Sequence, residues 1–159
     1  MSCQQVVSHT LRPGEAVEQT FHVRLDPLPR LVAVARKFVG EHAPPLPVET
    51  RDALLLLTSE LVTNAVLHAR TPFEVGITVT ETSVLVTVHD LDLTRPDQQP
   101  YEPREGGWGL GLVSALAEAW ALEPHPDGGK KAWFRLSREQ TPYVRDAAAA
   151  RREPQPGSL

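Results

Sequence analysis

The chain has 159 residues, of which 41% are hydrophobic, and a formal net charge of −4. This size suits one globular domain, and the mild negative charge gives no reason to expect direct contact with nucleic acid. The single cysteine, Cys3, excludes an internal disulfide framework and a cysteine-based zinc site. No apolar run approaches the roughly 20 residues that cross a membrane, and residues 1–19 lack the pattern of a signal peptide. We therefore expect a cytoplasmic protein in a reducing compartment, without a membrane partner.

Sequence patterns divide the chain into three parts. Residues 1–18 have no sustained periodicity and contain Pro13-Gly14, so we expect an irregular N-terminal arm. Residues 19–138 carry the periodic segments of one domain. Residues 139–159, with an alanine run and the sequence PQPGS, are predicted to form a disordered tail.

The domain begins with a predicted strand and a predicted helix. Apolar residues alternate with polar ones from Phe21 to Leu25, which indicates a half-buried strand. Asp26-Pro27 then has the residue types of a helix N-cap and first helical position, and Gly40 those of a helix end. We expect an amphipathic helix between them.

A second helix is predicted over Arg51 to Arg70, and it carries one polar line. Glu60, Asn64 and His68 recur every four residues, so they share a face of the helix over roughly 12 Å. Leucines flank them and most other positions are apolar, which is typical of a helix covered on most sides. Buried polar groups need partners, so Glu60 and His68 pair with each other or with the backbone, lie on a narrow exposed strip, or face a ligand with Asn64.

An antiparallel hairpin is predicted next, from two alternating runs that begin at Phe73 and Val84. Asp90 continues the parity of Val84, Val86 and Val88. If the strand persists, its carboxylate points to the core side and could accept a hydrogen bond from a ligand amino group. The alternative is that the strand has already turned and that Asp90 belongs to a loop.

A proline-rich segment from Leu93 to Glu105 predicts a long loop, which leads into a glycine-rich turn and a helix whose apolar stripe runs from Leu110 to Trp120. Glycines at a helix N-terminus can let backbone N–H groups approach a phosphate, although the same residues could form a hinge or a packing turn. The segment matches neither the dinucleotide fingerprint nor the Walker loop. Two further strands with a turn at Asp127-Gly128-Gly129 complete the domain.

Read together, three motifs in this order resemble the ATP-binding domain shared by gyrase-type ATPases, Hsp90, histidine kinases and mismatch-repair ATPases. They are E60-x-x-x-N64-x-x-x-H68 on a helix, Asp90 at a strand end, and G107-x-G109-x-G111 opening a helix. The short form most resembles the anti-sigma-factor serine/threonine kinases of actinobacteria. The resemblance implies that Glu60 is catalytic and that Asn64 binds Mg²⁺. It further implies an ATP site formed by Asn64, His68, Asp90, Gly107, Gly109, Leu110, Gly111 and Leu112.

The fold implied by this resemblance is an α/β two-layer sandwich in which helices cover one face of a mixed β-sheet. The implied function is an ATP- and Mg²⁺-dependent kinase, in homodimeric form, that binds a sigma factor or phosphorylates an anti-sigma-factor antagonist. The alternatives are a nucleotide-binding or nucleotide-independent interaction module without turnover, and a detached histidine-kinase catalytic domain. Two departures favour the alternatives: Asp92 replaces a usual glycine, and Lys131 stands where relatives carry a threonine facing the adenine.

Overall fold

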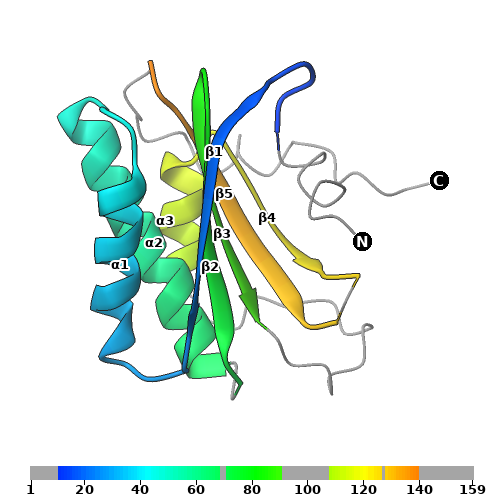
Figure 1. The fold of residues 1–159 in the computed structure, drawn as a ribbon. Coiled ribbons are helices and arrows are strands. Elements are labelled where there is room, and N and C mark those ends of the chain that lie inside the picture. Colours follow the sequence, from blue (N-terminus) through cyan, green and yellow to red (C-terminus); the bar gives the residue numbers. More distant parts are fainter. Residues whose placement is uncertain (1–10, 69–70, 91–107, 127, 140–159) are drawn as a thin grey trace.

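The computed structural model describes residues 11–68, 71–90, 108–126 and 128–139, which form three helices and five strands (Figure 1). The elements in chain order are β1 (Val17–Leu25), α1 (Leu31–His42), α2 (Val48–His68), β2 (Phe73–Thr80), β3 (Ser83–Asp90), α3 (Trp108–Leu116), β4 (Ala119–Pro124) and β5 (Lys130–Ser137). None of these helices is both long enough and apolar enough to span a bilayer.

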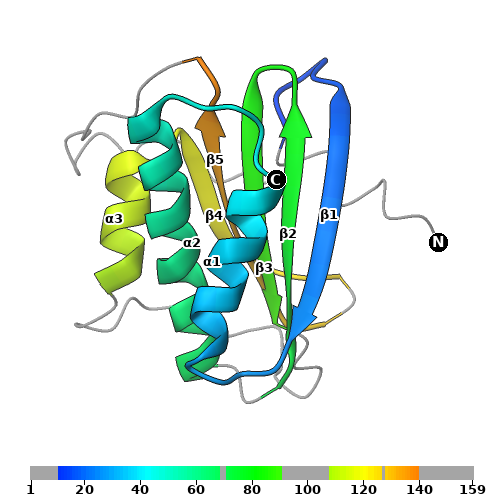
Figure 2. The same ribbon diagram turned by 60° about the vertical axis from the view of Figure 1, so that its left-hand side comes forward.

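The described elements form two layers, with the three helices on one face of a sheet of order β1-β2-β3-β5-β4 (Figures 1 and 2). This confirms the predicted α/β two-layer sandwich. In one detail the sheet differs from the expectation, because every strand pairing in the described part is antiparallel rather than mixed. The connection through α3 makes β4 run in the direction of β3, but β5 inserts between these two strands and pairs with both.

The core lies between the two layers. It is formed by apolar residues that recur at helical spacing in the helices and at every second position in the strands. On α2 the fully buried residues Leu54, Leu57 and Val62 recur at helical spacing, while on β3 Val84 and Val86 alternate with residues of the other face. Burying one such side chain contributes roughly 1.5–3 kcal/mol. The core therefore fixes α2 along the middle of the sheet, between α1 and α3 (Figure 2).

Two predicted boundaries differ from the structure. The first helix begins at Leu31 rather than near Asp26, because Pro29 disfavours helical geometry at the residue before it and residues 26–30 form turns instead. The last apolar residue of the predicted third helix, Trp120, belongs to β4 and pairs with Phe134. Trp120 packs against the core, so burial alone did not distinguish a helix from a strand.

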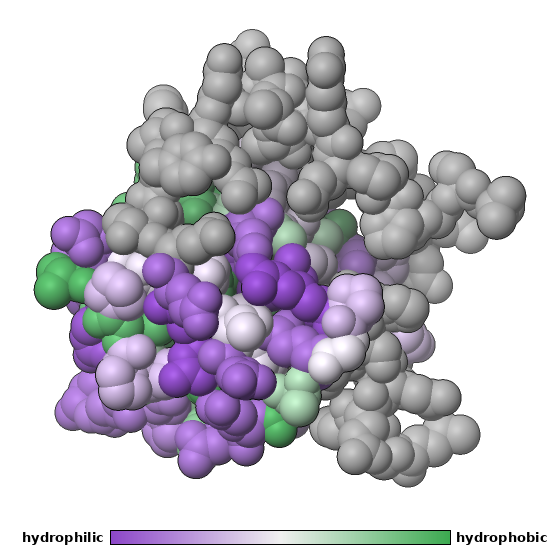
Figure 3. All heavy atoms as spheres, turned by 90° about the horizontal axis from the view of Figure 1, so that it is seen from above, coloured by the Kyte–Doolittle hydropathy of each residue, from purple (hydrophilic) through white to green (hydrophobic). Residues whose placement is uncertain are grey.

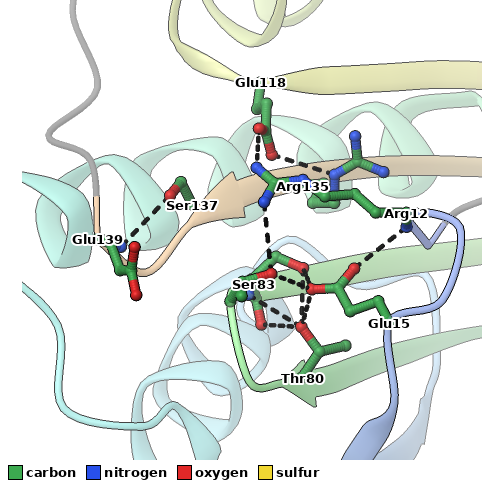
Figure 4. Close-up of polar contacts among 9 residues, drawn as sticks. Arg12, Glu15, Thr80, Ser83, Glu118, Arg135, Ser137 and Glu139 are labelled. Atoms are coloured by element: carbon green, nitrogen blue, oxygen red, sulfur yellow. Dashed lines mark hydrogen bonds and ion pairs between the residues drawn. The ribbon is translucent and has the colours of Figure 1, made fainter.

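The start of the described chain is tied to the turn between β2 and β3 by one carboxylate (Figure 4). Oε1 of Glu15 accepts hydrogen bonds from the hydroxyls of Thr80, Thr82 (2.6 Å) and Ser83 (2.6 Å). Oε2 accepts the backbone N–H of Arg12 at 3.1 Å. Burial raises the pKa of Glu15, but the hydrogen bonds from Ser83, Thr80, Thr82 and the Arg12 backbone outweigh it and lower the pKa to about 2.

A second carboxylate continues this network. Glu118 pairs with the guanidinium of Arg12 and with Nε of Arg135, the latter at 3.1 Å. Viewed from this end, the described surface is mostly hydrophilic (Figure 3). Although residues 11–16 form no helix or strand, polar contacts of Arg12 and Glu15 hold them against the sheet.

Replacing Glu15 with glutamine should destabilise the protein near pH 7 by about 1–2 kcal/mol, allowing for solvent screening of a partly exposed group. Because the folded-state pKa of Glu15 lies below the ordinary pKa of 4.5, the stabilisation is present above pH 4.5 and is lost as the pH falls toward 2. Urea unfolding followed by circular dichroism from pH 7 to pH 2 measures the difference. The control is Glu81→Gln in the same turn, where the side chain is exposed. A Glu15→Gln effect that is equally large at pH 2 would contradict this explanation.

Candidate functional site

The predicted site residues of α2 and β3 meet at one end of the domain. α2 ends at His68, and β2 begins five residues later at Phe73, which pairs with Asp90 at the end of β3. The C-terminal end of α2 and the end of β3 therefore lie at the same edge of the sandwich, at the lower end in Figures 1 and 2. Asn64 and His68 occupy the last two turns of α2, and Glu60 lies one turn before them.

The flank of α2 that carries Glu60 and Asn64 faces away from α1. A Cβ added to Gly40 of α1 would lie 3.2 Å from Cδ2 of Leu55, so α1 packs on the Leu55 side. At 100° per residue, Glu60 and Asn64 lie about 140° and 180° around the helix from Leu55. α3 packs on α2 on this opposite side (Figure 2). Both side chains are partly buried, whereas His68 is exposed.

The expectation that α2 is covered on most sides by the rest of the protein is only partly confirmed. Leu57 and Leu61 are buried, with exposed fractions of 0% and 2%, but Leu56 is 40% exposed and Leu67 is 69% exposed. The helix therefore has a buried face, two flanks in contact with neighbouring helices, and an open outer face. The polar line lies on a flank, where its side chains are accessible to a ligand without being part of the core.

Asp90 is a buried acid at the end of the central strand. It is the last residue of β3, shares the parity of Val84, Val86 and Val88, and is only 9% exposed. The strand thus continues to Asp90, and the alternative of an earlier turn is wrong. A carboxylate on the helix side of the sheet can accept hydrogen bonds from an amino group.

The turn between β4 and β5 packs directly against Asp90. Gly128 and Gly129 have φ angles of +98° and +74°, which glycine adopts most readily. A Cβ added to Gly129 would lie 2.0 Å from the carbonyl oxygen of Asp90 and 3.3 Å from its Oδ1. The sequence by itself identifies Gly128 and Gly129 only as turn residues. Their closeness to Asp90 depends on the pairing of β3 with β5, which local patterns do not reveal.

The glycine motif is described only from Trp108 onward, because Gly107 lies outside the described residues. Gly109, Leu110, Gly111 and Leu112 all belong to the first turns of α3. Leu112 is 40% exposed. An added Cβ on Gly111 would meet no heavy atom within 4 Å, so neither its packing nor its backbone conformation requires glycine. Glycine at this position leaves open space beside the start of the helix.

Sheet parity changes the interpretation of the lysines in β5. Ala132, Phe134 and Leu136 pack on the helix side, so Lys131 lies on the other face and Lys130 on the helix side. Lys131 Nζ is 3.9 Å from Oε1 of Glu123. Burial lowers the pKa of Lys131, and the charge of Glu123 partly offsets this effect. If the nucleotide binds on the helix side, as the family resemblance implies, Lys130 rather than Lys131 has the matching parity. Asp92 lies outside the described residues.

The residues present fit a nucleotide carried with Mg²⁺. Within the described segments, no three His, Cys, Asp or Glu side chains form a metal cluster. Mg²⁺ does not require one, because it often takes one or two protein ligands and fills its other positions with phosphate oxygens and water. Asn64 offers one amide oxygen, Asp90 offers a buried acceptor, and Gly111 leaves space at a helix start for an anion.

Comparison with known proteins identifies the class of the chain. The model of the histidine kinase-like ATPase domain matches residues 25–136, which is more than half of the sequence. The chain belongs to this family, and this membership implies that the domain binds ATP. The match runs from the last residue of β1 to Leu136 in β5, so it includes α2, the end of β3 and α3. No curated protein matches the chain significantly.

Replacing Gly129 with alanine should destabilise the protein by more than about 2 kcal/mol, since the new Cβ is both strained by the positive φ and blocked by a backbone oxygen. Gly14→Ala is a matched control, because Gly14 has a φ of +80° but nothing within 4 Å of an added Cβ. Urea unfolding of both variants separates the effect of φ from that of the Asp90 contact. Equal losses of unfolding free energy in the two variants would show that the close approach of Gly129 to Asp90 contributes nothing to the effect.

Proposed function

We propose that the protein is an ATP- and Mg²⁺-dependent serine/threonine protein kinase of the anti-sigma-factor type. In this proposal it phosphorylates an antagonist protein that competes with a sigma factor for binding, and it works as a homodimer without contacting DNA. The observation that supports it best is the presence of Glu60 and Asn64, one helical turn apart, on the α2 flank that α3 borders. In such an arrangement the carboxylate can serve as a proton acceptor and the amide as a metal ligand in the same site.

Each residue has a separate role in the proposal. Asn64 would hold Mg²⁺ through its amide oxygen, and Asp90 would accept a hydrogen bond from the adenine amino group. Gly107, Gly109 and Gly111 would let backbone N–H groups near the start of α3 approach the phosphates, next to Leu110 and Leu112, with His68 nearby. When bound, ATP supplies the transferable phosphoryl group and Mg²⁺ neutralises its charge.

Glu60 would act on the protein substrate rather than on the nucleotide. Its carboxylate would accept the proton of the serine or threonine hydroxyl as that oxygen bonds to the γ-phosphorus and the bond from this phosphorus to the β-phosphate oxygen breaks, releasing ADP. The structure supports this role in that Glu60 is partly buried on a flank shared with Asn64. In the alternative, the domain binds nucleotide without turnover and regulates its partner through contact alone.

Glu60→Ala should reduce transfer of labelled γ-phosphate to an antagonist from the same genome by about 100-fold or more, because the proton acceptor is lost. ATP affinity, measured by calorimetry, should stay within a few fold of wild type. Asp52→Ala is the control, since Asp52 is an exposed acid on the same helix.

Three outcomes separate the hypotheses. Transfer that depends on Glu60 supports the kinase. Binding of ATP by the wild type without transfer to any such antagonist favours the non-catalytic module. Failure of the wild type to bind ATP, ADP or a non-hydrolysable analogue contradicts nucleotide-dependent function in either form.

Gly111→Ala tests the phosphate side of the site. Alanine has the higher helix propensity and its Cβ meets open space, so thermal stability without ligand should rise by up to about 1 kcal/mol. ATP affinity should fall instead, because the methyl group would occupy space that the phosphates need. Ser114→Ala, in the same helix, should leave ATP affinity unchanged. If the Gly111→Ala protein is more stable than wild type and binds ATP with the same affinity, phosphate binding at this turn is excluded.

A further inference from the structure

His89 ties the end of β3 to the turn between β4 and β5. It is the residue before Asp90, and by strand parity its side chain lies on the sheet face opposite the helices, with Leu85 and Thr87. Nε2 of His89 lies 3.1 Å from the carbonyl oxygen of Gly128. Since a carbonyl only accepts hydrogen bonds, Nε2 carries the proton and donates it.

A second histidine strengthens the same connection. The ring of His125 stacks on the ring of His89, with centroids 3.8 Å apart and planes at 29°. The backbone of the turn is closed by Gly128 N–H to His125 O at 2.9 Å and by His125 N–H to Gly129 O at 3.0 Å. His89 therefore contacts this turn at two residues: it hydrogen-bonds to Gly128 and stacks on His125.

This turn is also the lateral support of Asp90 on the β5 side. The last described pair between β3 and β5 is His89 with Lys131, so the ladder ends one residue before Asp90. Beyond it, Gly129 abuts the Asp90 backbone so closely that an added Cβ would lie 2.0 Å from its oxygen. On its other side Asp90 pairs with Phe73, which is fully buried. Asp90 is thus held between a rigid strand and a turn that His89 anchors.

We propose that His89 is a positioning residue for the base-binding carboxylate: by anchoring the Gly128–Gly129 turn, it fixes Asp90 and thereby sets the preference for adenine over guanine. The proposal rests on the proposed ATP site. The carboxylate can accept a hydrogen bond from the amino group of adenine, whereas the corresponding group of guanine is a carbonyl oxygen, which is itself an acceptor. Hydrogen bonds weaken steeply with misalignment, so the discrimination depends on where the Asp90 oxygens are held.

The test compares three ligands, ATP, GTP and inorganic tripolyphosphate, each with Mg²⁺ and each measured by calorimetry on the full chain. His89→Ala should weaken ATP binding about tenfold and reduce the ratio of ATP to GTP affinity by a similar factor, the equivalent of one good hydrogen bond. Tripolyphosphate affinity should stay within twofold, because the phosphate side does not depend on the turn. A merely structural role would weaken all three ligands together.

Two further variants complete the design. His89→Gln keeps an N–H donor for the Gly128 carbonyl and should recover part of the ATP preference, and it also serves if His89→Ala folds poorly. Thr87→Ala, on the same strand and the same face, should behave as wild type. The inference is overturned if wild type binds ATP but His89→Ala keeps the wild-type ATP to GTP ratio, or if tripolyphosphate binding falls as much as ATP binding. If wild type binds no nucleotide, the proposed function fails and this inference fails with it.

Discussion

The contact between the buried face of α2 and the sheet is the interaction on which the rest of the molecule depends. Leu54, Leu57 and Val62 are fully buried and lie at helical spacing, so they fix the rotation of α2 as well as its position. That rotation places Glu60 and Asn64 on the flank beside α3 and leaves Leu56 and Leu67 at the outer surface. The polar line is thus oriented by the hydrophobic packing around it.

The two ends of the sheet are secured by different chemistry. At one end Glu15 gathers three hydroxyls and a backbone N–H, and Glu118 joins Arg12 to Arg135. These contacts are charge-assisted, and they add to the hydrogen bonds that the buried hydroxyls of Thr80 and Ser83 already share. At the other end a glycine turn and two stacked histidines support Asp90. The first end ties residues 11–16 to the sheet, and the second presents a buried acid at the end of β3.

The topology explains why the second end can hold a ligand. α1 and α2 form a returning pair between β1 and β2, so α2 finishes where β2 begins, and β2 begins opposite the end of β3. The antiparallel pairing of the strands therefore brings the end of β3 and the β4–β5 turn to one edge. The connection from α2 to β2 brings the end of α2 to the same edge. Membership of the histidine kinase-like ATPase family implies ATP as the ligand, and this edge, with the polar line on α2, is the candidate place for it.

Local periodicity in the sequence determined the kinds of elements and the places of Glu60, Asn64, His68 and Asp90 on a helix and a strand, while the two-layer class was implied by the family resemblance. It did so because side-chain direction repeats every 3.6 residues in helices and every two residues in strands. The tertiary structure alone decided the all-antiparallel pairing, the helix side for Lys130 instead of Lys131, and the contacts of Gly129 and His89 around Asp90. Each of these depends on the register between strands that are distant in sequence, where a shift of one residue exchanges the two faces of a strand. Similarly, Glu15 meets its hydroxyl partners in the β2–β3 turn across 65 or more residues of chain, and no local pattern specifies such a contact.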